Sequence, residues 1–393
     1  MVTRAPNLFN GEGFRSAARR RLPRAIFDYI DGGADDELTV RRNREDFESI
    51  ELMTRVLVDV SMRSLATTVC GIHLDLPLLI APTGLAGVIH SDGELGGLTA
   101  ALRHGTNLIL STGATYSVEE LTTSTGSAPW FQLYPTSDRG VREKLLSRAV
   151  EAGCPAVVVT VDCPVTGHRE RDLANRAVLP PKPSLANILD FAQHPGWVVG
   201  AVQGRRVTMK NLVPEATTRH AVAIAKMSLQ LFDPSLAWED LTWIRERWTG
   251  PLLVKGILNP MDAKEAVDRG ANGIIVSNHG GRQLDGAVSS IRALGPVVDA
   301  VGDRCDVLID GGIRRGIDVV KALALGARAC LIGRPWLYGL AAGGTTGVDK
   351  VLDLFEDEIH RALALLGLVR TADIDHHCIS EARATAPPSF SGG

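Results

Sequence analysis

Eight short apolar runs set the strongest limit on what this chain can fold into. They are rich in Val, Ile and Leu, are too short for helices, and lie between Gly, Pro, Asn or Asp residues. They occupy residues 78–81, 107–111, 130–134, 156–162, 252–255, 273–277, 306–310 and 329–332. Most are followed by a stretch of helical period, for example 141–152, 261–269 and 317–325. This alternation predicts an α/β fold of parallel βα units. Eight units match a closed (β/α)8 TIM barrel, and a doubly wound sheet is the alternative.

Two segments fall outside this repeat. Residues 1–75 precede the first run and are expected to form a helical cap, because apolar residues recur at helical spacing within 25–30. Residues 177–237 form a long insertion after the fourth run, which includes Pro180, Pro181 and Pro183. Such loops are usually lids, binding loops or disordered segments. The tail 386–393 is rich in Pro, Ser and Gly and is expected to be disordered.

The 393 residues are long enough for two or three average domains, but a barrel with insertions also reaches this length. We therefore expect one domain, 1–393. With 45% hydrophobic and 22% charged residues, the composition is that of a soluble enzyme. The net charge of -3 gives no attraction to nucleic acid. No apolar run approaches the roughly 18 residues of a membrane span, and the arginine-rich start has no secretory apolar stretch.

The six cysteines include no CxxC pair, so neither a metal site nor a disulfide framework is predicted. Unpaired cysteines favour a cytoplasmic location.

Polar residues close the runs at the end where barrel enzymes build their active sites. They are Gln132, Tyr134, Thr160, Asp162, Lys255, Ser277, Asn278, His279, Asp310, Gly333 and Arg334. Any one of them could merely satisfy a loop backbone. Together they predict a polar mouth.

Glycines and arginines follow the seventh and eighth runs, at 310–316 and 333–335. Glycine lets a backbone approach a ligand closely, and exposed amides with arginines neutralise an anion. Tight turns also need glycine, but barrel enzymes commonly hold a phosphate after strands seven and eight. A phosphorylated cofactor or substrate is predicted here.

The densest motif is residues 277–286, Ser-Asn-His-Gly-Gly-Arg-Gln-Leu-Asp-Gly. The imidazole of His279 can take a proton near neutral pH, and Arg282 can pair with a carboxylate beside it. Asp162 closes a neighbouring run and can orient the imidazole. A carboxylic acid substrate is therefore predicted. The alternatives are that His279 is a structural histidine and that Asp162 only caps a loop.

These motifs resemble the FMN-dependent α-hydroxy acid oxidase and dehydrogenase family. The resemblance extends over residues 22–374 and is carried by 277–286, 310–316 with 321–326, 333–335, and 160–162 with Arg169, Asp172 and Arg176. It implies FMN as cofactor and a 2-hydroxy acid as substrate. His279 would then be the base and Asp162 its partner. The substrate carboxylate would meet Tyr29, Arg169 and Arg282, and Tyr134 would hydrogen-bond near the hydroxyl.

The resemblance also implies a set of flavin contacts. They are Pro82, Thr83 and Gly84 near N5, Ser111, Gln132, Thr160 and Ser277 at the ring and ribityl groups, Lys255 at the N1/O2 edge, and Asp310, Gly312, Arg314, Gly333 and Arg334 toward the phosphate. Within this scheme we favour hydride transfer from the substrate to the flavin over a carbanion. The electron acceptor, whether oxygen, a quinone or a protein, is left open.

Two glycines bear on the substrate. Gly84 stands where many family oxidases have alanine, and it resembles the glycine that mandelate dehydrogenase has there. Gly113 stands where glycolate oxidase has a bulky side chain. Both favour a larger (S)-2-hydroxy acid, such as the aromatic mandelate, over a short-chain acid such as lactate or glycolate. The family also implies a homotetramer. The insertion has six Lys or Arg against three acids, which favours at most a weak peripheral contact with a membrane.

Two rival interpretations remain open at this point. Lys255 could form a Schiff base in a phosphate-binding lyase, or the chain could be a scaffold that kept a ligand mouth without catalysis.

Overall fold

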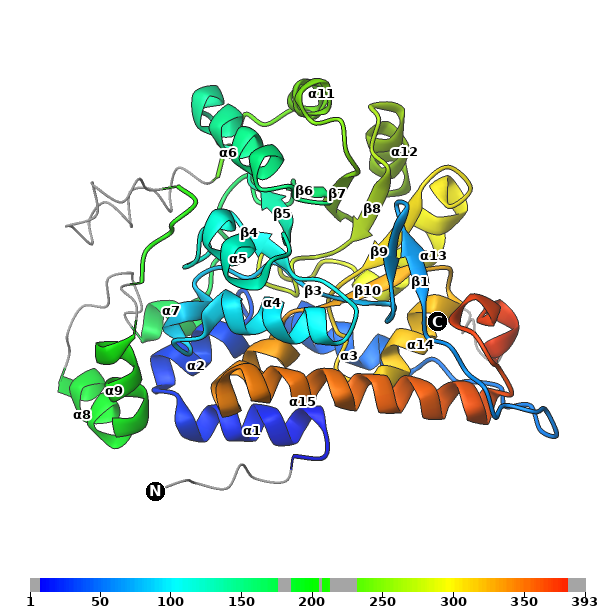
Figure 1. Ribbon diagram of the computed structural model, residues 1–393, viewed down its shortest axis with the longest axis horizontal. Helices are drawn as coiled ribbons and strands as arrows, with labels where there is room; N and C mark the ends of the chain where they lie inside the picture. Colours follow the sequence, from blue (N-terminus) through cyan, green and yellow to red (C-terminus); the bar gives the residue numbers. More distant parts are fainter. Residues whose placement is uncertain (1–7, 176–184, 205–206, 213–231, 381–393) are drawn as a thin grey trace, which may run out of the picture.

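A closed eight-stranded parallel barrel forms the centre of the molecule (Figure 1). The structure is a computed structural model that describes residues 8–175, 185–204, 207–212 and 232–380. The barrel strands are β3 (Leu78–Ile80), β4 (Ile109–Ser111), β5 (Trp130–Leu133), β6 (Val157–Thr160), β7 (Leu252–Ile257), β8 (Gly273–Val276), β9 (Asp306–Ile309) and β10 (Ala329–Ile332). Consecutive strands pair in parallel, β10 pairs with β3, and a bridge between Ile80 and Leu108 closes the ring. The predicted (β/α)8 barrel is confirmed, and each strand lies within a predicted run, apart from the end of β7.

Helices surround the barrel, one after each strand. They are α4 (Gly93–Arg103), α5 (Val118–Thr125), α6 (Arg139–Glu151), α11 (Trp238–Arg247), α12 (Pro260–Asp268), α13 (Ser290–Val301), α14 (Gly316–Ala324) and α15 (Arg334–Leu366). Side-chain caps fix several starts: Asp138 accepts from the amides of Gly140 and Val141 at α6, and Asn259 caps α12 before Pro260. The three predicted helical stretches are confirmed to within two residues.

A hairpin closes the amino-terminal end of the barrel. Its strands β1 (Thr67–Val69) and β2 (Ile72–Leu74) pair antiparallel around Cys70 and Gly71. Val69 and Leu74 pack in one apolar cluster with interior side chains of the barrel strands, among them Leu79 and Trp130. The expectation of a wholly helical cap over 1–75 is therefore wrong for this part, since strands of three residues are too short to show a period.

The rest of the cap is helical, as predicted. α1 (Gly11–Arg21), α2 (Arg24–Asp31) and α3 (Leu38–Glu48) cover one side of the barrel, and α1 runs beside α15 in Figure 1. Asp31 at the end of α2 joins three elements: its carboxylate accepts from Arg15 Nε at 2.6 Å, Tyr338 Oη at 2.7 Å and Arg171 Nη1 at 3.1 Å.

The insertion after β6 is more ordered than predicted where the structure describes it. It holds α8 (Leu185–Gln193) and α9 (Pro195–Gln203), preceded by the short α7 (Glu170–Ala174). Pro195 starts α9 at a position that tolerates proline, and Phe191 stacks on Trp197 with ring centroids 5.4 Å apart. The expected lid loop is therefore partly helical where the structure describes it. Pro180, Pro181, Pro183, Arg176 and the tail 386–393 lie outside the described residues.

Candidate active site

A cavity of about 320 Å³ opens at the carboxyl ends of the barrel strands. Most residues proposed from the sequence line it: Tyr29, Pro82, Thr83, Gly84, Ser111, Gly113, Tyr134, Arg169, Lys255, His279, Arg282, Asp310, Gly312, Arg314, Gly333 and Arg334. Parallel strands present their carboxyl ends at the same rim, which is why residues more than 200 positions apart meet here. The predicted polar mouth is thus found at this rim.

The remaining predicted residues lie just behind the cavity wall. Gln132, Thr160 and Ser277 are almost fully buried at their strand ends, and Asp162 lies behind His279. Ser111 Oγ donates to Gln132 Oε1 at 3.2 Å, so strands β4 and β5 present one connected polar floor.

Several polar atoms around this floor are buried without a partner among the described residues. They are Thr83 Oγ1, Gln132 Nε2, Thr160 Oγ1 and Asp310 Oδ1. A buried donor or acceptor left without a hydrogen bond is costly. A planar heterocycle with ring nitrogens, carbonyls and a hydroxylated chain supplies the missing partners, so the residues present suit a flavin.

Lys255 is held as a buried cation. Its Nζ lies 2.9 Å from Asp310 Oδ2 and donates to Ser277 Oγ at 2.8 Å. Burial lowers the pKa of Lys255, but the carboxylates of Asp310 and Asp162 outweigh it and the net pKa is raised. An ammonium cannot attack a carbonyl, and this argues against the Schiff-base alternative. It can stabilise negative charge on a bound ring.

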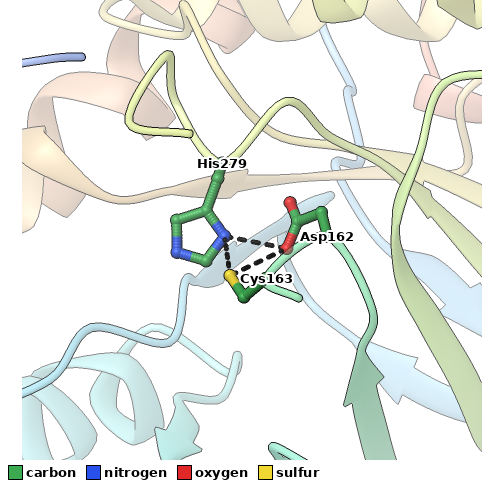
Figure 2. Close-up of side chains that lie close together, drawn as sticks. All are labelled: Asp162, Cys163 and His279. Atoms are coloured by element: carbon green, nitrogen blue, oxygen red, sulfur yellow. Dashed lines mark hydrogen bonds and ion pairs between the residues drawn. The ribbon is translucent and has the colours of Figure 1, made fainter. Parts of the chain in front are cut away.

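His279 forms a compact cluster with Asp162 and Cys163, shown in Figure 2. Its Nδ1 lies 3.0 Å from Asp162 Oδ1 and 3.5 Å from Cys163 Sγ. The pKa of Asp162 is lowered: burial raises it, but the charge and hydrogen bond of His279 and the charge of Lys255 outweigh burial. A carboxylate at Nδ1 fixes the imidazole orientation and leaves Nε2 as the nitrogen free to act as a base.

Local backbone geometry makes room for this cluster. His279 has a left-handed φ of 57°, and its backbone N–H donates to Ser277 Oγ at 3.0 Å. Gly256 in β7 has φ 107°, and a Cβ there would lie 2.5 Å from Cβ of Asp162. Only glycine at 256 therefore lets Asp162 sit beside β7 and reach the imidazole.

Three arginines bring positive charge to the cavity. Arg282 donates to the carbonyl of Gly32 at 2.9 Å, and its guanidinium lies 5.4 Å from the ring centroid of Tyr29. Burial, with the nearby charges of Arg169 and Arg334, lowers the pKa of Arg282 to about 9. Arg169 lies 3.6 Å from Asp172, its only ion-pair partner among the described residues. The positive charge exceeds the negative charge here, so the site favours a carboxylate ligand.

Arg314 and Arg334 bring further positive charge to the cavity. Arg334 donates to the carbonyls of Gly32 and Gly280 at 2.8 and 2.9 Å. Burial lowers the pKa of Arg314 to about 10. Arg315, part of the same motif, is instead paired with Glu358 at 2.6 Å. The predicted anion site is therefore left with Arg314 and Arg334.

The other residues of the 277–286 motif hold the loop in place. Asn278 and Asn43 exchange side-chain hydrogen bonds at 2.8 and 2.9 Å. Asp285 accepts from the amides of Leu38 and Thr39 at the start of α3. The side-chain amide of Gln283 donates to the carbonyls of Asp162 and Val165, so one loop positions both His279 and Asp162.

A family model described as FMN-dependent dehydrogenase matches residues 18–381. An L-lactate dehydrogenase of Caulobacter sp. (strain K31) is 47% identical over 371 residues, which are 94% of this chain and 97% of that protein. The chain belongs to the FMN-dependent dehydrogenase family. The protein is accordingly an FMN-dependent 2-hydroxy acid dehydrogenase, an oxidoreductase that acts on CH–OH donors.

Solved structures of the FMN-dependent dehydrogenase family agree with this assignment. A crystal structure of the monotopic membrane protein (S)-mandelate dehydrogenase is 42% identical, with a TM-score of 0.91 and coverage of 95% of this chain and 99% of that chain. A mandelate oxidase with (S)-mandelic acid is 36% identical, with a TM-score of 0.79 and coverage of 95% and 98%. Among the described residues of this chain, no helix is long and apolar enough to cross a bilayer.

Sequence reasoning missed an apolar wall of the cavity. Leu85, Met209 and Phe232 line it and pack together, and the Phe232 ring lies edge-on to Tyr134 at 5.9 Å. Met209 and Phe232 come from the insertion, where neither a period nor a strand end marks them. Cys163 was also missed as a contact of His279, although its position after Asp162 could have indicated it.

Proposed function

We propose that this dehydrogenase oxidises an (S)-2-hydroxy acid with a large or aromatic side chain, such as mandelate, to the 2-oxo acid. The observation that carries this proposal is that Gly84 and Gly113, which both line the cavity, have no side chain to fill it. A Cβ at position 113 would already be in van der Waals contact with Ser111 Oγ at 3.8 Å, Met209 Cε at 3.9 Å and Gly84 Cα at 4.0 Å, so a larger residue there would take up part of the cavity. Leu85, Met209 and Phe232 border the same cavity with apolar surface, which suits an aryl group.

The substrate carboxylate is bound by Arg282 and Arg169, with the phenol of Tyr29 beside them. His279 takes the hydroxyl proton at Nε2, and Asp162 stabilises the imidazolium that results. Burial raises the pKa of Tyr134 well above its ordinary value, so Tyr134 stays a neutral phenol that donates a hydrogen bond to the substrate oxygen.

FMN would be held by the floor residues Ser111, Gln132, Thr160 and Ser277, by Lys255, and by Pro82, Thr83 and Gly84 along one edge. Asp310, Gly312, Arg314, Gly333 and Arg334 would hold its ribityl phosphate. When bound, FMN supplies the two-electron acceptor for the hydrogen on Cα. Arg282 and Arg169 bind the substrate carboxylate and so orient the substrate Cα, and His279 holds the proton taken from the hydroxyl.

The test is anaerobic flavin reduction by glycolate, L-lactate, (S)-mandelate and (S)-4-hydroxymandelate, followed at the flavin absorbance. The proposal predicts a higher second-order rate constant for the aromatic acids than for L-lactate or glycolate. Faster reduction by glycolate or L-lactate would contradict the proposed substrate class while leaving the family assignment intact.

L-Lactate is the second candidate substrate. The observation that favours it is the 47% identity to a protein named L-lactate dehydrogenase. A short side chain would leave the space beside Gly113 unfilled, so this alternative requires a conformation in which Met209 or Phe232 approaches the substrate. The same panel of acids separates the two candidates.

We also propose peripheral attachment to a membrane through α8 and α9. Both helices lie at the edge of the molecule, away from the barrel strands (Figure 1). Leu189, Val199 and Val202 expose 65%, 51% and 79% of their surface, and apolar side chains of this kind gain free energy in an acyl layer. The cytoplasmic location and the homotetramer remain predictions.

Flotation with anionic vesicles tests this attachment. The double variant Val199→Ser with Val202→Ser should bind the vesicles at least about tenfold more weakly, because about 1.5 kcal/mol or more of apolar burial is lost. Met261→Ser, which removes an equally exposed apolar residue from α12, serves as the control and should bind normally. Equal flotation of both variants and the native chain would refute this contact.

A further inference from the structure

Cys163 has no part in the proposed reaction, yet its sulfur touches both the base and the carboxylate. Its Sγ lies 3.5 Å from His279 Nδ1 and donates to Asp162 Oδ1 at 3.4 Å, and the two other atoms are 3.0 Å apart. Figure 2 shows the three side chains pointing toward one another from the loops after β6 and β8. We propose that Asp162, Cys163 and His279 form an inhibitory site for a thiophilic divalent cation such as Zn²⁺.

The geometry of the cluster agrees with the ligand sphere of zinc. Tetrahedral Zn²⁺ binds thiolate sulfur at about 2.3 Å and imidazole nitrogen or carboxylate oxygen at about 2.0–2.2 Å. Such a sphere separates sulfur from nitrogen or oxygen by roughly 3.6 Å and nitrogen from oxygen by roughly 3.3 Å. The observed separations are already close to these values, so binding requires shifts of only a few tenths of an ångström.

The surroundings of the cluster bear on both metal coordination and metal entry. Oδ2 of Asp162 is buried without a hydrogen-bond partner among the described residues, so the carboxylate retains capacity for a ligand. His279 lines the cavity and its side chain is 23% exposed. Of the three residues, His279 alone lines the cavity, so a cation would enter past its imidazole and keep water in its fourth position.

Binding at Nδ1 would remove the base. A neutral imidazole that binds metal through Nδ1 carries its proton on Nε2, so no lone pair remains there for the substrate hydroxyl. Cys163 binds as a thiolate: the S–H bond breaks, a sulfur–metal bond forms, and the proton leaves to solvent without any redox change. This consequence rests on the proposed role of His279 as base, whereas the binding itself does not.

The FMN-loaded enzyme tests both parts with two readouts. Cd²⁺ is titrated first, and binding is followed by the ultraviolet cadmium–thiolate absorption and by equilibrium dialysis. Zn²⁺ is then added to anaerobic flavin reduction by (S)-mandelate or L-lactate, whichever reduces the native enzyme faster. Mg²⁺, which prefers oxygen ligands, is the cation control.

Cys163→Ser and Cys163→Val provide two independent variants. For each variant, flavin reduction with metal is compared with flavin reduction of the same variant without metal. Loss of an outer-shell partner already costs 10–100-fold in metal affinity, so loss of the sulfur ligand should raise the inhibitory Zn²⁺ concentration by about 100-fold. His377→Ala is the matched control, because Asp375, His376 and His377 form an exposed cluster that could also hold a metal.

The proposal predicts thiolate absorption with Cd²⁺, inhibition by Zn²⁺ that a chelator reverses, no effect of Mg²⁺, and loss of both effects in the Cys163 variants but not in His377→Ala. Unchanged inhibition in the Cys163 variants, or no thiolate absorption with Cd²⁺, would overturn the site. Thiolate absorption without inhibition would overturn the inhibitory role and count against His279 as base.

Discussion

His279 is oriented from three directions. Ser277 accepts its backbone N–H, Asp162 lies at Nδ1, and a left-handed φ of 57° fixes the direction of its side chain. Non-glycine residues rarely adopt that conformation and hold it at a cost, which is common at functional sites. The proposed base is thus placed by its own loop, while Asp162 after the end of β6 supplies the negative charge beside it.

Asp162→Asn should slow anaerobic flavin reduction by about 100-fold or more, because the imidazolium loses its carboxylate and its tautomer is no longer fixed. KM should change little, since Arg169 and Arg282 still bind the substrate. The measurement is stopped-flow reduction with the flavin spectrum of the bound FMN as the control for folding. A decrease of less than threefold in the rate of flavin reduction would show that Asp162 has only a packing role.

Gly113→Leu should reverse the substrate preference. The new side chain would occupy the space beside Gly84 and Met209, and each methylene excluded from a pocket costs roughly 10–200-fold in discrimination. We expect kcat/KM for (S)-mandelate to fall at least about 100-fold and that for L-lactate to fall less than about fivefold. Equal losses of kcat/KM for both acids would show that the aryl group does not lie beside residue 113.

At the scale of single residues, the sequence predicted those site residues that lie at strand ends or within the spaced motifs. His279, Asp162, Lys255 and Arg282 lie together at the cavity, as strand-end position indicated. Met209 and Phe232 could not be found this way, because they reach the cavity from an insertion whose path depends on tertiary packing.

Among the secondary-structure elements, the barrel strands could be predicted from the sequence but several shorter elements could not. The barrel strands are buried on both faces and therefore read as continuous apolar runs, which made them predictable in number and position. The β1–β2 hairpin and helices α8 and α9 were missed, because three-residue strands are shorter than any detectable period and the two helices of the insertion are only nine residues long. What holds such elements is contact with the barrel and the cap.

The connection of α2 to its neighbours depends on Asp31. Burial raises the pKa of its carboxyl, but hydrogen bonds from Arg15 and Tyr338 outweigh burial and hold the pKa below its usual range. A depressed native pKa stabilises the fold above the unfolded pKa of about 3.9, and this stabilisation is lost as pH falls through the native value.

Asp31→Asn should accordingly lower the free energy of unfolding by about 2 kcal/mol at pH 7, the size expected for hydrogen bonds to a charged group. The difference from the native chain should shrink as the pH falls below about 4. Urea unfolding at several pH values measures both. Glu12→Gln, whose exposed carboxylate also contacts Arg15 at 3.2 Å, should change stability by less than about 1 kcal/mol. A pH-independent Asp31 effect would contradict this account.

At the scale of the whole molecule, the cofactor should complete the fold. Polar atoms of β5, β6 and the loop after β9 lack partners among the described residues, and Arg314 and Arg334 line the cavity. A ligand that binds only the native state stabilises it by about 2.7 kcal/mol at 100 times its Kd.

FMN should therefore raise the Tm of the apoprotein, and riboflavin, which lacks the phosphate, should raise it less at equal concentration. Arg314→Gln should reduce the advantage of FMN over riboflavin, since the buried guanidinium of Arg314 is proposed to meet the phosphate. Thermal unfolding of apoprotein with each ligand measures this. Equal shifts for both flavins would place the phosphate away from Arg314.

The most direct test of the central claim is anaerobic flavin reduction in the variant His279→Ala. This variant should retain yellow, stoichiometric FMN but be reduced by its best 2-hydroxy acid at least about 100-fold more slowly than the native enzyme. Rapid and complete bleaching of the flavin in His279→Ala would contradict the role of His279 as base.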